Sequence, residues 1–310
     1  MSKKILLIGA GGIGFRHFQG LLSSKYEMEI NVYDKNFNTY LKFIEYIKIN
    51  KSKNKINFLK KLKKQKKIDL LILSTYSTDR LKIFKKLTSL CEIRNALFEK
   101  IVFTDKASFD EAIAIKKKYN IKIWVNCLRR EVPIYNEIKN KIGNRNIALS
   151  YTGCNWGMGS NVIHFIDLFF YLKKTKNIKI ISKIKKIISS KRKNFNEILG
   201  HINFIDQNNN KLYLEDSKRY MQNKLEIKFG DKKFVLKNGE VTCKINNIII
   251  NKKKINENVS EITRIFVNKL FAKDKIKLTT LEKSKIYHQI FFQIIEKYNK
   301  KNYINKINFT

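Results

Sequence analysis

Three glycines near the start of the chain have the spacing of a phosphate-binding turn. An apolar run over residues 5–8 leads into Gly9-x-Gly11-x-x-Gly14. A helix beginning after such a turn presents free backbone N–H groups and the positive end of its dipole, which together bind a pyrophosphate. The first glycine permits the tight turn, the second lets phosphates approach the backbone, and the third lets the helix pack on the strand. The residues expected to contact a dinucleotide here are Gly9, Gly11, Gly12, Ile13 and Gly14.

An acidic residue stands where the ribose of such a dinucleotide would bind. A second apolar-rich stretch, residues 28–33, ends at Asp34, which lies 20 residues after Gly14. A carboxylate at this distance accepts hydrogen bonds from the adenosine ribose and repels the 2′-phosphate that distinguishes NADP. Lys35 follows directly and carries the opposite charge. We therefore expect NAD as the cofactor, with NADP bound less well; the alternative is a glycine turn in an unrelated α/β unit.

Strand and helix patterns alternate over the first 124 residues, as a turn of this kind requires. Continuous apolar runs such as residues 70–73 are typical of parallel strands covered on both faces. Alternation with helices predicts a doubly wound Rossmann domain over residues 1–124. Residues 60–67 are rich in lysine and are expected to form a solvated helix or loop. The expected strands are 4–8, 29–33, 56–58, 69–74, 96–98 and 122–126, and the expected helices are 12–23, 37–49, 78–90 and 108–119.

The pattern changes in the rest of the chain, residues 125–310. Between about residues 178 and 250 the sequence is strand-like and interrupted by turn signals such as Asn208-Asn-Asn210 and Asn238-Gly239. Antiparallel strands of this kind form an open sheet that needs helices on one face. We therefore expect a C-terminal α+β domain over residues 125–310. Its expected helices are 131–142, 161–172, 257–270 and 280–298, and its only proline, Pro133, is expected in the first turn of a helix.

The formal net charge of +39 would ordinarily suggest a nucleic-acid partner. However, only nine of the 65 basic residues are arginine, the residue that reads base edges most often, and the lysines are spread over the whole length. No helix-turn-helix, zinc-finger or RNA-recognition pattern is present. We therefore expect no nucleic-acid partner, although the charge favours anionic substrates such as nucleotide sugars or sugar acids.

Composition also argues against a membrane span, a secretory leader and a metal site. The longest apolar stretch, residues 162–172, is too short to cross a bilayer and contains His164 and Asp167. The apolar run after Lys3 and Lys4 is too short for a signal peptide. The four cysteines are far apart without a CxxC pair, and the four histidines lack ligand spacing. These features predict a protein of the reducing cytoplasm with no metal ion.

The glycine turn and the Arg16-His17 pair after it resemble the opening of the Gfo/Idh/MocA family of NAD(P)-dependent oxidoreductases. Further landmarks follow in that family's order and spacing, and they extend the resemblance over nearly the whole chain. They are Ser74-Thr75, Glu99-Lys100, Asn126 with Arg130-x-x-Pro133, Gly157-x-Gly159 ahead of His164-x-x-Asp167, and Leu278-Thr-Thr-Leu281.

The resemblance implies hydride transfer to or from a sugar or related alcohol. It places Lys100 beside the nicotinamide and the reacting hydroxyl, and Glu99, Ser74 and Thr75 on the cofactor. His164 is the expected proton carrier, because its ordinary pKa lies near working pH. Without the resemblance, a histidine on an apolar helix is more often a packed core residue. The expected substrate-side residues are Arg130, Asn155, Trp156, Asn161 and Asp167, with an ion pair for Arg130 and a structural role for Asp167 as the alternatives.

Three departures from the family's pattern bear on function. Ile101 follows Lys100 where the family has proline, and the turn from Thr75 to Arg80 lacks the usual proline and histidine. Ser160 stands four residues before His164, where most family enzymes have aspartate. Members linked to surface-polysaccharide synthesis look similar at Asn155-Trp156 and from Gly159 to His164.

Two function classes follow. The leading hypothesis is an oxidoreductase of a sugar or nucleotide sugar in surface glycan biosynthesis, acting as a homo-oligomer by analogy with the family. The alternative is a catalytically silent regulator or scaffold that binds the dinucleotide, since Ser160 replaces an expected carboxylate.

Overall fold

The chain divides into two compact units. The computed structural model describes residues 2–175, 177–302 and 308–310. The first unit comprises Met1–Glu131 and Asn258–Lys285, and the second comprises Val132–Glu257 and Ile286–Thr310. The division expected from the sequence, 1–124 and 125–310, assigned residues 125–131 and 258–285 to the second domain. The structure packs both segments with the first unit, because a late helix covers the first helix and a late strand joins the first sheet.

The first unit is built on a seven-stranded sheet with the order β17-β8-β7-β5-β1-β2-β3. Neighbouring strands from β8 to β3 are parallel, and β17 pairs antiparallel with β8 at one edge. The chain thus leaves β1 in one direction toward β2 and returns on its other side at β5, which is the doubly wound arrangement. The strands are β1 (Lys3–Ile8), β2 (Met28–Tyr33), β3 (Lys55–Leu59), β5 (Leu70–Leu73), β7 (Asn95–Phe98), β8 (Lys122–Val125) and β17 (Thr279–Thr280).

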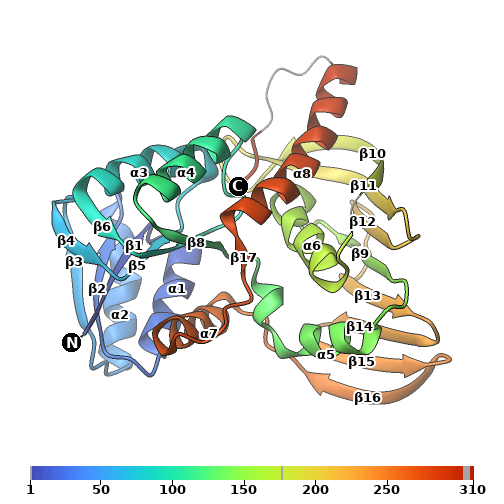
Figure 1. Ribbon diagram of the computed structural model, residues 1–310, viewed down its shortest axis with the longest axis horizontal. Coiled ribbons are helices and arrows are strands. Elements are labelled where there is room, and N and C mark those ends of the chain that lie inside the picture. Colours follow the sequence, from blue (N-terminus) through green and yellow to red (C-terminus); the bar gives the residue numbers. More distant parts are fainter. Residues whose placement is uncertain (1, 176, 303–307) are drawn as a thin grey trace. The chain divides into compact units, whose positions relative to one another are not determined.

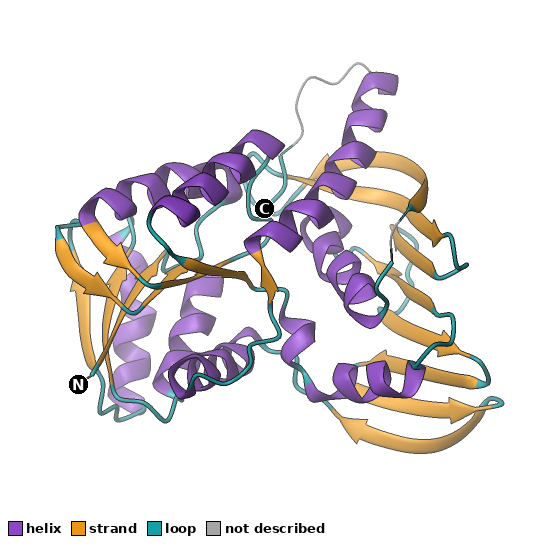
Figure 2. Cartoon of the chain, viewed as in Figure 1, coloured by secondary structure: helices purple, strands orange, loops and turns teal. Residues whose placement is uncertain are grey.

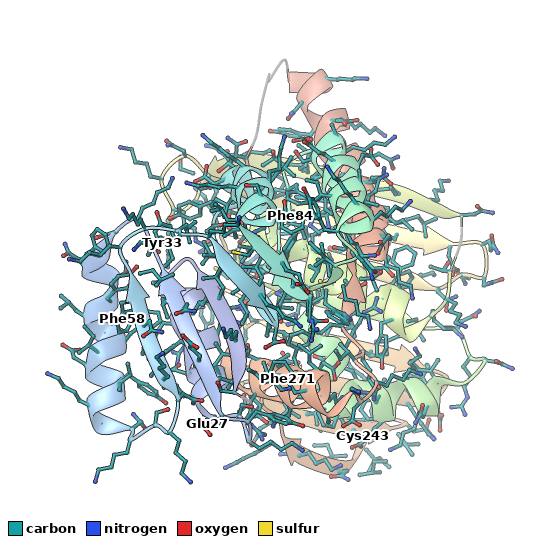
Figure 3. The ribbon with its side chains drawn as sticks, turned by 60° about the vertical axis from the view of Figure 1, so that its left-hand side comes forward. Glu27, Tyr33, Phe58, Phe84, Cys243 and Phe271 are labelled. Carbon is teal, nitrogen blue, oxygen red and sulfur yellow. The ribbon has the colours of Figure 1, made fainter. Side chains whose placement is uncertain are left out.

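Helices cover both faces of this sheet. Figure 1 shows α1, α2 and α7 on one face and α3 and α4 on the other. In Figure 3, Phe84 of α3 and Phe271 of α7 lie on opposite sides of the sheet. A side chain at Gly20 would lie 2.3 Å from the Ser260 carbonyl oxygen, so this glycine lets α1 and α7 pack closely. The helical segments are α1 (Gly12–Leu22), η1 (Phe37–Tyr40), α2 (Leu41–Ile49), α3 (Ser77–Leu90), α4 (Lys106–Lys118), η2 (Leu128–Glu131) and α7 (Val259–Ala272).

One local expectation was wrong in part. The lysine-rich stretch 60–67 is expected to form a helix or loop, but its last three residues belong to β4 (Gln65–Ile68). This strand pairs parallel with β6 (Cys91–Ile93) in a separate two-stranded sheet. The local sequence does not reveal this short strand, because three of its four residues are lysine or glutamine and its pairing partner lies beyond the following helix.

The second unit is an eight-stranded, mainly antiparallel sheet with the order β10-β11-β12-β9-β13-β14-β15-β16. Its one parallel pairing joins β12 to β9. Figure 2 shows the helices of this unit gathered on one face of the sheet. The strands are β9 (Ala148–Cys154), β10 (Ile178–Ser189), β11 (Asn196–Asp206), β12 (Lys211–Ser217), β13 (Lys224–Phe229), β14 (Lys232–Lys237), β15 (Glu240–Ile245) and β16 (Ile248–Lys254).

The helices of the second unit follow the apolar pattern of the sequence. In α5 (Pro133–Ile142) the proline occupies the first turn, as expected. The core of the unit is α6 (Met158–Leu172), whose Phe165, Phe169 and Leu172 are buried. The last helix, α8 (Leu281–Asn302), starts in the closing segment of the first unit and continues in the second. The expected fold class, a parallel Rossmann sheet followed by an α+β domain with a mainly antiparallel sheet, is confirmed.

Candidate functional site

The glycine turn of the first unit leaves a cradle at the start of α1. Gly9 has φ +94°, and a side chain at Gly14 would lie 1.8 Å from the Gly9 carbonyl oxygen, so both positions require glycine. A Cβ at Gly11 or Gly12 would instead meet nothing within 4 Å. Gly11 precedes the helix and offers no side-chain cap. The backbone at Gly11 and Gly12, at the start of α1, is therefore open to the approach of a ligand, as a pyrophosphate site requires.

Asp34 is held against this turn. One carboxylate oxygen, Oδ2, accepts a hydrogen bond from the Ala10 amide at 2.6 Å, and Oδ1 accepts one from the Asn36 amide at 2.8 Å. A carboxylate has about four acceptor sites, so capacity for ribose hydroxyls is left. The structure therefore joins Asp34 and the glycines at the end of β1, as the sequence predicts.

The next strand along the sheet completes this edge of the first unit. Ser74 follows β5, and its hydroxyl lies 2.7 Å from the Gly9 carbonyl oxygen and 3.0 Å from that of Ile8. The neighbouring Thr75 has a buried Oγ1 with no hydrogen-bond partner among the described residues. Ligands of doubly wound sheets bind at these carboxyl ends, where the strand order reverses. An orphaned hydroxyl beside an open glycine cradle fits a bound dinucleotide.

A buried polar network lies behind the following strand end. Glu99 comes directly after β7 and is 6% exposed. Its Oε1 accepts hydrogen bonds from the side-chain Nδ2 of Asn126 and, at 2.9 Å, from Nε2 of the fully buried His17. The other ring nitrogen of His17 lies 2.8 Å from Thr263 Oγ1 on α7. The expectation that Glu99 contacts the cofactor stays a prediction, but its observed partners are protein groups.

The hydrogen-bond partners of His17 favour a ring that donates from both nitrogens. Thr263 has one hydroxyl hydrogen, which it donates to the Val259 carbonyl oxygen at 2.7 Å, so it accepts from Nδ1 of His17. A carboxylate only accepts, so Nε2 donates to Glu99. Burial alone would raise the pKa of Glu99, but His17, Lys100 and Asn126 together lower the pKa below its usual value. His17 and Glu99 therefore form a buried ion pair.

This ion pair makes the free energy of unfolding sensitive to acid. Because the pKa of Glu99 is lowered in the folded state, its contribution is complete above the unfolded value of 4.5 and is lost as pH falls through the lower folded value. Glu99→Gln is expected to lower the free energy of unfolding by about 3 kcal/mol at pH 7. In urea unfolding, the difference in the free energy of unfolding between Glu99→Gln and the unmodified protein should become smaller below about pH 4. The matched control is the exposed Glu92→Gln, and an equal pH dependence in both variants would contradict the ion pair.

Lys100 follows Glu99 in the same strand-end loop. It is partly exposed, and the peptide bond between it and Ile101 is cis. Arg80, on the first turns of α3, is buried and donates hydrogen bonds to the carbonyl oxygens of Thr75, Ile101 and Val102. Sequence reasoning missed this role, since an arginine in the first turns of a helix ordinarily faces solvent.

In the second unit, two carboxylates accept hydrogen bonds from groups at the start of α6. Asp216 accepts hydrogen bonds from the amides of Trp156, Gly157 and Met158 at 3.0–3.3 Å. Burial raises the pKa of Asp216, and these amides oppose that rise. Glu197 of β11 accepts hydrogen bonds from the amide and the hydroxyl of Ser160. The Glu197 carboxylate therefore lies beside Ser160, although the aspartate expected at this position is missing. It comes from β11, a strand that the sequence pattern did not connect with this helix.

The remaining expected substrate residues are distributed over both units. His164 and Asp167 lie on α6 and are 8% and 0% exposed. Trp156 donates its indole N–H to the Glu215 carbonyl oxygen at 2.8 Å, and Asn161 donates to the Trp156 carbonyl oxygen at 3.0 Å. Asn155 is exposed. The structure thus brings Trp156 and Asn161 together, while the buried Arg130 and the partly exposed Lys100 belong to the first unit.

The part of the chain that the structure describes contains neither a metal-ligand cluster nor a membrane-spanning helix. Within residues 2–175, 177–302 and 308–310, no group of three or more His, Cys, Asp or Glu side chains has the placement of a metal site. In the same described ranges, no helix is both long and apolar enough to cross a membrane.

The fold is shared with solved structures of low sequence identity. No protein-family model and no curated protein match the chain. A dehydrogenase (MviM) from Clostridium difficile superimposes with a TM-score of 0.73 at 18% identity, covering 96% of this chain and 100% of its own. UDP-N-acetylglucosamine 3-dehydrogenase GnnA from Acidithiobacillus ferrooxidans gives 0.72 at 12% identity, with 95% and 97% covered. The chain has the fold of the Gfo/Idh/MocA-type oxidoreductases.

One of the solved structures that share this fold is named as a transcriptional regulator and not as an enzyme. The transcriptional regulator Gal80p from Kluyveromyces lactis matches with a TM-score of 0.73 at 14% identity, covering 97% of this chain and 90% of its own. Other structures of this fold contain NAD+, or NADP together with TDP-benzene. Identity of this order shows the architecture, and function has to be argued from the residues.

Proposed function

We propose that this chain is an NAD(P)-dependent oxidoreductase that acts on a hydroxyl or keto group of a sugar, most readily a nucleotide-linked sugar used in surface glycan biosynthesis. The observation that carries the proposal is the open cradle at Gly11 and Gly12, joined to Asp34, together with the buried, unpartnered hydroxyl of Thr75 in the loop after β5. Support for the substrate class comes from the high positive charge and from the dehydrogenase of a UDP-sugar that shares the fold. By analogy with the family, the proposal includes assembly of the chain into a homo-oligomer.

Each site residue has a defined task in this proposal. The α1 amides bind the pyrophosphate, and Asp34 accepts the ribose hydroxyls. Bound NAD(P) supplies the hydride donor or acceptor. The Lys100 ammonium donates a hydrogen bond to the reacting oxygen and stabilises the negative charge that develops there. His164 takes the hydroxyl proton during oxidation and returns it during reduction.

The assay for this proposal is direct. Purified protein is incubated with NAD+ and, separately, with UDP-sugars, TDP-sugars, free sugars and cyclitols, while absorbance of the reduced cofactor is followed. Turnover with one of these classes is the expected result. Saturable NADH binding without any turnover would favour the second function below, and failure to bind either dinucleotide would contradict both.

A second candidate function is a dinucleotide-binding regulator. The observation that favours it is Ser160, which replaces an aspartate and is occupied by hydrogen bonds with Glu197. The regulator Gal80p shows that the fold serves other roles.

Cofactor preference gives a separate test of the Asp34 assignment. We expect NADH to bind about tenfold more tightly than NADPH, because the Asp34 carboxylate repels a 2′-phosphate. Fluorescence titration of the reduced cofactors measures both dissociation constants. Asp34→Asn should narrow the difference, and an equal or reversed preference in the unmodified protein would reject the assignment.

A further inference from the structure

Arg80 joins two strand-end loops of the first unit through one guanidinium group. Its Nη1 donates to the carbonyl oxygens of Ile101 and Val102, the latter at 2.6 Å, and its Nη2 donates to that of Thr75. Thr75 belongs to the loop after β5, whereas Ile101 and Val102 directly follow Lys100 in the loop after β7. The side chain is 1% exposed and is among the largest fully buried side chains.

Burial of this cation is unfavourable in itself. Burial lowers the pKa of Arg80 to about 10, with Glu99 opposing the shift, so the guanidinium is still charged at neutral pH. Its hydrogen bonds go to carbonyl oxygens, and its Nε has no partner among the described residues. Apolar side chains of similar volume commonly stabilise a protein as well as a buried charge does. Stability alone therefore does not account for Arg80, whereas a defined loop conformation does.

Neither loop has a proline at the position that follows Thr75 or Lys100. Proline fixes one backbone dihedral, but Tyr76 follows Thr75 and Ile101 follows Lys100. A planar guanidinium with several donors in fixed directions can hold carbonyl groups from two segments at once. A lysine ammonium is a compact point charge and lacks this fork.

We propose that Arg80 is a positioning residue that fixes Lys100 by holding the loop after β5 and the loop after β7 as one body. The link to turnover rests on the proposed function, in which Lys100 contacts the reacting oxygen. The link between the loops does not rest on it, since it follows from the three hydrogen bonds.

Hydrogen–deuterium exchange tests the link without any assay of activity. In Arg80→Met, amides in peptides covering residues 74–79 and 99–104 are expected to exchange about tenfold faster, and both should change together. The matched control is Arg94→Met, which removes the same charge from a side chain that is 54% exposed. Unchanged exchange, or faster exchange in one loop alone, would overturn the proposal. If Arg80→Met does not fold, Arg80→Lys is judged by the same criteria, because it keeps the charge but loses the fork.

Kinetics test the positioning of Lys100. Arg80→Met is expected to lower kcat by about 100-fold, because a displacement near 1 Å has this effect. The dissociation constant of NADH should rise by less than about tenfold, because the α1 amides and Asp34 lie outside the two loops, although Thr75 lies in one of them. Guanidinium at millimolar concentration should restore kcat of Arg80→Ala by about tenfold. Equal losses in kcat and NADH affinity, or no rescue, would show a merely structural role and overturn the positioning claim. An unmodified protein without turnover on any sugar would reject the proposed function, while the exchange experiment still decides the loop link.

Discussion

Lys100→Met is expected to lower kcat by about 10³-fold while the protein still folds and binds NADH. The side chain is partly exposed at the end of a parallel strand, so its loss removes a charge from the site without opening the core. Removal of one group that stabilises charge on a reacting oxygen has an effect of about this size. Steady-state kinetics with the best sugar from the substrate panel measure it, and NADH fluorescence measures cofactor binding separately.

His164→Ala is the companion variant in the second unit, with an expected loss of about 10² to 10⁴ in kcat. Matched controls exist for both positions. Lys106→Met changes an exposed lysine at the start of α4, and His201→Ala changes a histidine on β11. Both controls should retain activity. Full turnover in Lys100→Met and in His164→Ala would reject the assigned roles, even if the chain binds the cofactor.

The glycine turn gives the second large effect, this time as a contrast between two substitutions. In Gly14→Ala the new methyl would lie 1.8 Å from the Gly9 carbonyl oxygen, so either α1 or the turn must shift. The expected loss in the free energy of unfolding is about 3 kcal/mol, as for overpacking against rigid backbone. Urea unfolding followed by circular dichroism measures this loss.

Gly11→Ala separates binding from folding at the same turn. Its methyl meets nothing within 4 Å in the protein, and Gly11 has φ −64°, so the free energy of unfolding should change by less than about 0.5 kcal/mol. The affinity for NADH should fall at least about tenfold, because the methyl occupies the space that the phosphates approach. Unchanged NADH affinity in Gly11→Ala would move the pyrophosphate away from this cradle and remove the main support for the proposed function.

Local patterns of the sequence predict the first sheet well. The central strands β1 and β5 contain short continuous apolar runs, and the turn after β1 is specified by glycines that backbone contacts make necessary. The same reasoning cannot find β17, a two-residue strand, because only its pairing with β8 defines it. Likewise, the sequence of residues 258–272 does not by itself predict that α7 packs on α1.

The site was predictable where function follows from position in an element, and not where it depends on distant partners. Asp34 is placed by its distance from the glycines and by the strand that precedes it. Glu197 reaches Ser160 from another element 37 residues away, and Arg80 turns inward to carbonyl groups 21 and 22 residues further along. Pairings of this kind arise from the packing of whole elements, so the types of neighbouring residues do not reveal them.

The position of Thr263 has a consequence for how the chain folds during synthesis. Thr263 provides the acceptor for buried His17, although 246 residues separate them in sequence. When residues 1–131 have left the ribosome, α7 and β17 have not yet been made, and the second unit is synthesised before them. Contacts of such long sequence separation form late and slowly. The first unit, although it begins the chain, is therefore completed only after nearly all of the chain has emerged.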